Sequence, residues 1–113
     1  MNILEETVKL LREEFDYKNL EAKVDNSEHD VETVEWFKEQ IQKGIHEPIL
    51  INADNEVLDG NHRLKAYQEL GIEPPLLYRG ERKDFYNTAK EANYDGIKII
   101  KLMIEYGTAE RIN

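Results

Sequence analysis

Residues 48–71 have the sequence PILINADNEVLDGNHRLKAYQELG, and the elements expected within this segment define the plan of the chain. An apolar run at 49–53 predicts a buried strand. Asp54 and Asn55 tolerate the positive φ of a two-residue turn, which allows residues 56–58 to return as a short second strand. The segment therefore predicts an antiparallel β-hairpin.

A helix is expected directly after Gly60, over residues 61–70. Its apolar side chains recur with helical spacing and form one face: Leu64, Tyr67 and Leu70. Gly71 is typical of the residue that ends a helix in the left-handed conformation. The hairpin is thus followed by a glycine turn and a helix whose first turn carries His62 and Arg63.

The start of this helix is a candidate anion-binding site, because the first amides of a helix have no internal partner and carry partial positive charge. Gly60 allows a ligand to approach the backbone, and an exposed Arg63 offers a forked donor that suits phosphate. His62 can donate or accept a hydrogen bond near neutral pH. The alternative is a hairpin that simply continues into a helix capped by Asp59 or Asn61.

The DGNHR motif at 59–63 resembles the signature of the superfamily that contains the ParB amino-terminal domain and sulfiredoxin. Further positions that fit this signature are Ala66, Leu70 and Gly71. The surrounding order of elements is similar over about residues 20–80. The resemblance implies an α+β fold with a small mixed β-sheet packed with helices. The chain, residues 1–113, is then one domain with a helical extension at 84–107.

The resemblance also implies a ligand and a reaction. The residues that would hold the phosphates of a nucleoside triphosphate, ATP or CTP, are Gly60, Asn61, His62 and Arg63. Asp59 would position Mg²⁺ or a nucleophile, and Asp59 and His62 are the predicted catalytic residues at the signature. Phosphoryl transfer depends mainly on positioning and charge neutralisation. Hydrolysis of the nucleotide, or transfer of its phosphoryl group, therefore suits so sparse a site.

A third catalytic candidate lies earlier in the chain. In the free-serine kinases that share this superfamily fold, an acidic residue shortly before the corresponding helix takes part in catalysis. Glu28 or Asp30 would take that place here, and Glu28 is the predicted catalytic residue. The alternative role of both carboxylates is to supply favourable charge at a helix N-terminus.

The absence of cysteine excludes one activity of the superfamily. Sulfiredoxins carry a catalytic cysteine between the glycine and the histidine of the signature, where this sequence has Asn61. Because the chain has no cysteine, sulfiredoxin activity and a thiolate metal site are both excluded.

The chain is acidic, with a net charge of −9. Residues 1–35 carry 11 acidic and 4 basic side chains, which is −7 of that total. Because an acidic protein repels the DNA backbone, free-standing DNA binding is not expected. An acidic half can instead dock a basic protein partner. The second function class is therefore a non-catalytic interaction module, of a kind that fits a mobile-element or viral origin; the oligomeric state stays open.

Two helices are expected before the hairpin, at 3–15 and at about 29–43. A half-exposed strand is expected between them at 20–24, where apolar and polar residues alternate. Ser27 and Asp30 are both placed to cap the second helix.

After the hairpin and its helix, a short strand is predicted at 76–78. Asp84 is expected to cap a helix that carries Phe85, Ala89 and Ala92, and a last helix is expected at about 97–106. The tail after Gly107 is expected to be loose. No apolar run approaches the length of a membrane helix and no signal peptide is evident, so we expect a cytoplasmic location.

Overall fold

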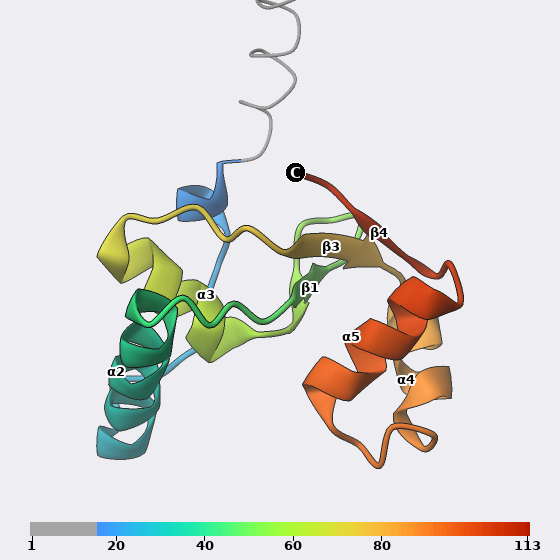
Figure 1. Ribbon diagram of the computed structural model, residues 1–113, viewed down its shortest axis with the longest axis horizontal. Helices are drawn as coiled ribbons and strands as arrows, with labels where there is room; N and C mark the ends of the chain where they lie inside the picture. The colour runs from blue at the N-terminus through green and yellow to red at the C-terminus, as the bar shows by residue number, and fades with distance from the viewer. Residues whose placement is uncertain (1–15) are drawn as a thin grey trace, which may run out of the picture.

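The computed structural model describes residues 16–113 (Figure 1). Within them lies a mixed sheet with the strand order β2-β1-β3-β4. The strands are β1 (Ile49–Ile51), β2 (Val57–Asp59), β3 (Leu77–Gly80) and β4 (Ala109–Arg111). The helices are η1 (Tyr17–Asn19), α2 (Glu28–Gln42), α3 (Asn61–Leu70), α4 (Arg82–Ala89) and α5 (Gly96–Glu105). The predicted α+β fold with a small mixed sheet packed with helices is confirmed.

The strand β1 lies at the centre of the sheet, parallel to β3 and antiparallel to β2. Successive side chains of a strand point to opposite faces. Ile49 and Ile51 accordingly join one apolar cluster and Leu50 joins another, and all three are fully buried. Because β1 is buried on both faces, all of its residues are apolar and its sequence shows no alternation.

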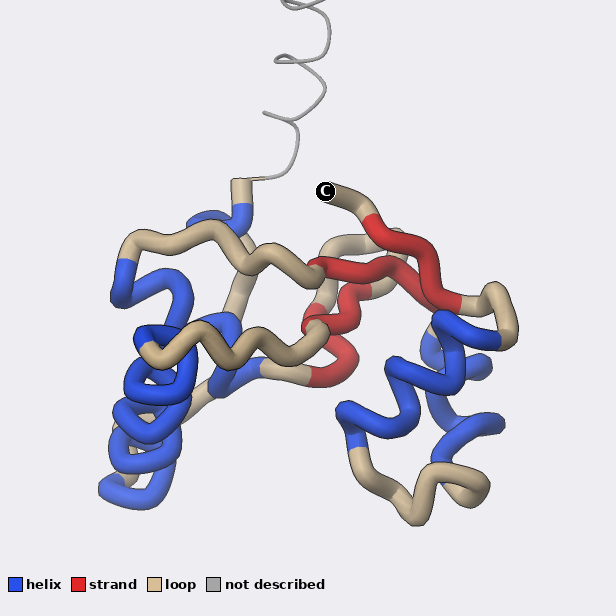
Figure 2. The backbone as a smooth tube through the Cα atoms, in the orientation of Figure 1, coloured by secondary structure: helices blue, strands red, loops and turns tan. Residues whose placement is uncertain are grey.

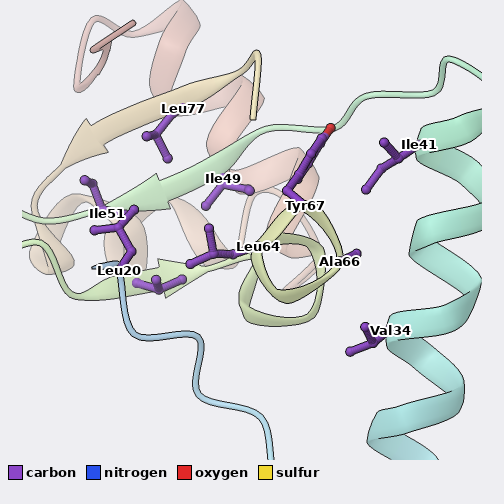
Figure 3. Packing of buried hydrophobic residues seen from close by; sticks show 10 residues of the cluster. Leu20, Val34, Ile41, Ile49, Ile51, Leu64, Ala66, Tyr67 and Leu77 are labelled. Carbon is purple, nitrogen blue, oxygen red and sulfur yellow. The ribbon is translucent and has the colours of Figure 1, made fainter. Parts of the chain in front are cut away.

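Each face of β1 is covered by its own pair of helices (Figures 1 and 2). The helices α2 and α3 cover Ile49 and Ile51, and the side chains of Leu64 and Tyr67 close this first cluster (Figure 3). On the other side, α4 and α5 cover Leu50 through residues that include Ala89, Ile99, Ile100 and Met103. The hairpin therefore lies between two helical units, α2 with α3 and α4 with α5.

The predicted hairpin is confirmed, with strands that are displaced from the expected limits. Asn55 adopts the expected positive φ, 62°, in the turn. β1 ends at Ile51 because the Asn52 side chain folds over the turn. Its Oδ1 accepts hydrogen bonds from the amides of Asp54 at 3.0 Å and Glu56 at 2.9 Å. The Asn52 amide still donates across the hairpin to Glu56 O at 2.9 Å, and the turn begins there, so the strand does not continue to residue 53.

The prediction of a strand at 20–24 is wrong. Two backbone groups of this segment bond to side chains of α3 instead of to a neighbouring strand. Gln68 Nε2 donates to Leu20 O at 2.8 Å, and the Lys23 amide donates to Asn61 Oδ1 at 2.9 Å. The apolar alternation reflects burial of Leu20 against α3 and not membership of the sheet.

The prediction of a loose tail is also wrong. β4 pairs antiparallel with β3, with Gly80 opposite Ala109 and Tyr78 opposite Arg111. Asn113 Nδ2 then donates to the carbonyl of Pro74, so the end of the chain is tied to the loop before β3. The strand has three residues and one buried side chain, which is too little for a periodic pattern in the sequence.

The other helices follow the sequence closely. Ser27 caps α2 as expected, since its Oγ accepts a hydrogen bond from the Asp30 amide at 3.1 Å. The predicted cap of α4 is wrong, because Glu81 occupies the cap position and Asp84 lies inside the first turn. The helix predicted at 3–15 falls outside the described residues. Among helices of the part that is described, none is long and apolar enough to cross a membrane.

Candidate phosphate site

The site begins at Gly60, which joins β2 to α3. Its φ of 106° belongs to the left-handed region, where a side chain is strained. A Cβ atom there would also lie 3.0 Å from Arg63 Nη2 and 3.1 Å from Ile49 Cγ1. Glycine is therefore required by the backbone conformation and by internal packing, which is a different reason from the approach of a ligand.

The first turn of α3 presents unpaired amides. Its first intrahelical bond is donated by the Leu64 amide to Gly60 O at 2.8 Å, and no side chain caps the helix. Between residues 16 and 113, the amides of Asn61, His62 and Arg63 find no acceptor. Such amides carry the positive end of the helix dipole and suit an anion.

Arg63 does not point outward, so the expectation of an exposed phosphate donor is wrong. Only 9% of its surface is exposed. Its Nη2 donates to Asp59 Oδ2 at 2.8 Å and to Pro48 O at 2.9 Å, and its guanidinium lies over the ring of Phe37. Arg63 thus ties α3 to both strands of the hairpin and to α2.

Asp59 is enclosed by two different elements. On one side it accepts the hydrogen bond from Arg63, and on the other it touches Gly96, the first residue of α5. A Cβ atom added to Gly96 would lie 2.6 Å from Asp59 Cγ. Asp59 therefore adds a polar contact between the hairpin and the carboxyl-terminal helices to the apolar packing around Leu50.

Within residues 16–113, the side chains around Asp59 do not by themselves make a Mg²⁺ site. The carboxylate of Asp59 is already neutralised by Arg63 at 2.8 Å. No cluster of three or more histidine or acidic ligands occurs in the described part of the chain. Any Mg²⁺ would have to arrive with a ligand that supplies most of its oxygens.

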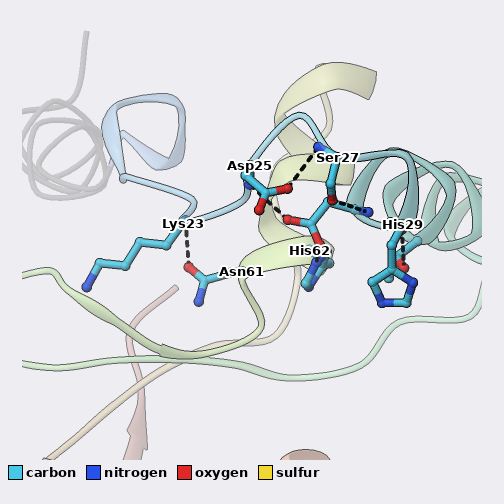
Figure 4. A network of polar contacts seen from close by, with 8 residues as sticks. Lys23, Asp25, Ser27, His29, Asn61 and His62 are labelled. Carbon is cyan, nitrogen blue, oxygen red and sulfur yellow. Dashed lines mark hydrogen bonds and ion pairs between the residues drawn. The ribbon is translucent and has the colours of Figure 1, made fainter.

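His62 connects the N-termini of α3 and α2 (Figure 4). Its Nε2 lies 2.9 Å from Asp30 Oδ1, and Asp30 Oδ2 accepts a hydrogen bond from the Asp25 amide at 2.8 Å. The hydrogen bond with His62, followed by that from Asp25, lowers the pKa of Asp30 below its ordinary value of 3.8. The sequence left open whether Glu28 or Asp30 takes the catalytic place before this helix. Asp30 is the one that contacts His62, whereas Glu28 is exposed at the start of α2.

Lys23 is a site residue that the sequence did not single out. The bond between its amide and Asn61 Oδ1 places it beside the start of α3 (Figure 4). Its side chain is exposed. The only sequence signal is its position within the alternating 20–24 segment, and that pattern was taken for a strand.

The signature residues therefore form pairs: Asp59 with Arg63, His62 with Asp30, and Asn61 with Lys23. The two basic side chains of the signature, His62 and Arg63, each contact a carboxylate. Among the described residues, the donors left for a ligand include the three amides of the first turn, Asn61 Nδ2 and the His62 ring, whose side chain is 34% exposed. The arrangement can bind an anion through the backbone.

Comparison of the chain with known proteins gives no match among protein-family models, curated proteins or solved structures.

Proposed function

We propose that this chain is a ParB/sulfiredoxin-like domain that binds the phosphates of a nucleoside triphosphate, ATP or CTP, at the start of α3. The observation that carries the proposal is the uncapped helix N-terminus after Gly60, with three amides that have no acceptor within residues 16–113. The DGNHR signature and the order of hairpin, helix and parallel strand support it.

In this proposal the backbone of the first turn contacts the phosphate oxygens. Amides at a helix N-terminus are pre-oriented donors, so they bind an anion without a conformational change. The Lys23 amide is bonded to Asn61 Oδ1, and its exposed side chain, which now lies near Glu56, would turn toward the bound phosphates. His62 lies at the edge of the turn. Arg63 acts indirectly, because its bonds to Asp59 and Pro48 hold the turn that presents the amides.

Catalysis is a separate part of the proposal. Hydrolysis or phosphoryl transfer would use Asp59 and His62, as predicted from the signature, and Glu28, as predicted from the resemblance to the free-serine kinases. His62 is the one of these three that lies at the uncapped turn with a partly exposed ring. Release of inorganic phosphate from ATP or CTP by the wild type, and its loss in His62→Ala, would support turnover.

Binding itself is tested by the melting temperature, because a ligand of the folded state stabilises it by mass action. Millimolar ATP or CTP should raise the melting temperature of the wild type. Lys23→Glu should weaken nucleotide binding by about fivefold, or about 1 kcal/mol. Lys65→Glu is the matched control, since it makes the same charge change one turn further along α3. Equal affinities of the two variants would remove Lys23 from the site.

A second candidate function is an interaction module that docks a basic protein. The observation that favours it is the charge of α2, which carries one lysine and five acidic residues: Glu28, Asp30, Glu32, Glu35 and Glu39. The same helix exposes 55% of Trp36 and 49% of Val31. An acidic helix with exposed apolar side chains is typical of a protein-binding surface.

A further inference from the structure

A groove lies between α2, α3 and the start of α5, with a volume of about 190 Å³. Its apolar lining consists of Trp36, Phe37, Ile41, Ile45, Tyr67 and Ile97. The polar side chains Gln40, Glu47 and Arg63 also reach it. Two helical units that are far apart in sequence thus form one concave apolar surface.

Trp36 is the most exposed of the residues that line this groove. It stands edge-on against Phe37, with ring centroids 5.0 Å apart, yet 55% of its surface remains exposed. Ile45, which also lines the groove and follows the end of α2, is 47% exposed. Large side chains that line a hollow and stay half exposed are characteristic of binding surfaces.

Trp36 also borders a second hollow, which runs along α2 to the end of α3 at Leu70. This hollow is lined by Val31 and Leu70, by Lys38 and Gln42, and by three carboxylates, Glu32, Glu35 and Glu39. Lys38 contacts Glu35 at 2.8 Å, and Lys43 contacts Glu39 at 3.4 Å. The pair of Lys43 with Glu39 is solvent-exposed and contributes little, so a basic group of a partner can replace it. Lys38 is only 21% exposed and is also held by Glu69 at 2.9 Å, so it stays in place.

The size of the groove limits its occupant. Sites for small molecules usually measure about 300–1,000 Å³, which is more than this groove provides. A volume of about 190 Å³ instead suits one large apolar side chain. Interfaces between proteins are commonly anchored by such a side chain in a pocket, with charged contacts around it.

We infer that this surface binds a basic segment of a partner protein. One apolar side chain of that segment fills the groove beside Trp36 and Ile97, and its lysine or arginine residues cross α2 toward Glu32 and Glu39. The inference rests on the second candidate function and is independent of nucleotide binding. Charge complementarity selects a basic segment over an acidic one.

The test uses the fluorescence of Trp36, the single tryptophan of the chain. Three helical peptides of about 14 residues are titrated: a lysine-rich peptide with one central Phe, the same peptide with Ser in place of Phe, and its counterpart with Glu in place of Lys. The first should shift the emission to the blue, because it covers the indole. It should bind at least tenfold more tightly than the second, and the third should not bind.

Variants locate the contact. Ile97→Ser removes part of the groove and should reduce the affinity for the Phe peptide to that for the Ser peptide. Glu32→Lys combined with Glu39→Lys should weaken binding of both lysine-rich peptides at least tenfold. Glu105→Lys, at the other end of α5, is the matched control and should leave binding unchanged. Unchanged melting temperatures would show that each variant is folded, and shifts of the Ile45 amide give a second readout.

The outcomes separate the inference from the function on which it rests. Equal binding of the Phe and Ser peptides would overturn the claim that an apolar side chain fills the groove, while leaving an acidic docking surface. Binding of neither at millimolar concentration would overturn both. A dimer in sedimentation equilibrium that Ile97→Ser dissociates would identify a second copy as the occupant and overturn the basic partner.

Discussion

The guanidinium of Arg63 donates to the carboxylate of Asp59 at 2.8 Å, across the glycine turn at Gly60. The pair joins the last residue of β2 to the first turn of α3. The same guanidinium bonds to Pro48 O at 2.9 Å, directly before β1. The charged ends of the signature thus fix the turn that presents the amides.

Arg63→Ala should destabilise the unliganded protein. Loss of the guanidinium leaves the Asp59 carboxylate and the Pro48 carbonyl without their donor, at a cost of about 2–4 kcal/mol in the free energy of unfolding. Urea denaturation measures this cost, and Lys65→Ala on the same helix is the control. If Arg63→Ala unfolds at the wild-type midpoint, the guanidinium has no structural role.

Gly96→Ala should destabilise the protein by about 1–3 kcal/mol, because the new methyl group overlaps the carboxylate of Asp59. The cost should be smaller in a protein that already carries Asp59→Ala, since the overlap is then removed. A double-mutant cycle measures this coupling. Additive effects of the two substitutions would show that Asp59 and Gly96 are not in contact.

The link between Asp30 and His62 should make stability depend on acid pH. The pKa of Asp30 is lowered in the folded protein, so its contribution is complete above the ordinary value of 3.8. That contribution is lost as the pH falls through the lowered pKa. Asp30→Asn should therefore flatten the fall in melting temperature below pH 3.8. His29→Ala, on the neighbouring residue of α2, should leave the profile unchanged.

The elements that follow from local sequence were predictable. The hairpin turn depends on Asn55, the start of α3 on Gly60 and its end on Gly71, and each acts within a few residues. The Ser27 cap of α2 is equally local. These features occur in the structure as predicted because no contact with a distant segment favours another conformation there.

The rest depends on contacts between distant segments. Nothing near residues 20–24 shows that their backbone bonds to Gln68 and Asn61, and nothing near Ala109 shows that it pairs with β3. The contact of Gly96 with Asp59 has no local signal either.

The orientation of Arg63 did have a signal in the sequence. Asp59 and Arg63 have opposite charges and are only four residues apart, on the two sides of the turn at Gly60, which brings them within reach of each other. The phosphate-binding interpretation treated both side chains as free. Their mutual neutralisation moves the predicted contact with phosphate from side chains to backbone amides.

The central claim is that the amides at the start of α3 bind phosphate, and nuclear magnetic resonance tests it directly. Amide spectra are recorded while ATP, CTP or inorganic tripolyphosphate is added to the wild type. We predict saturable shifts that are largest at Asn61, His62 and Arg63, with smaller changes at Lys23. The absence of shifts at these amides at millimolar ligand, or larger shifts at Arg82 and Lys83, would contradict the account.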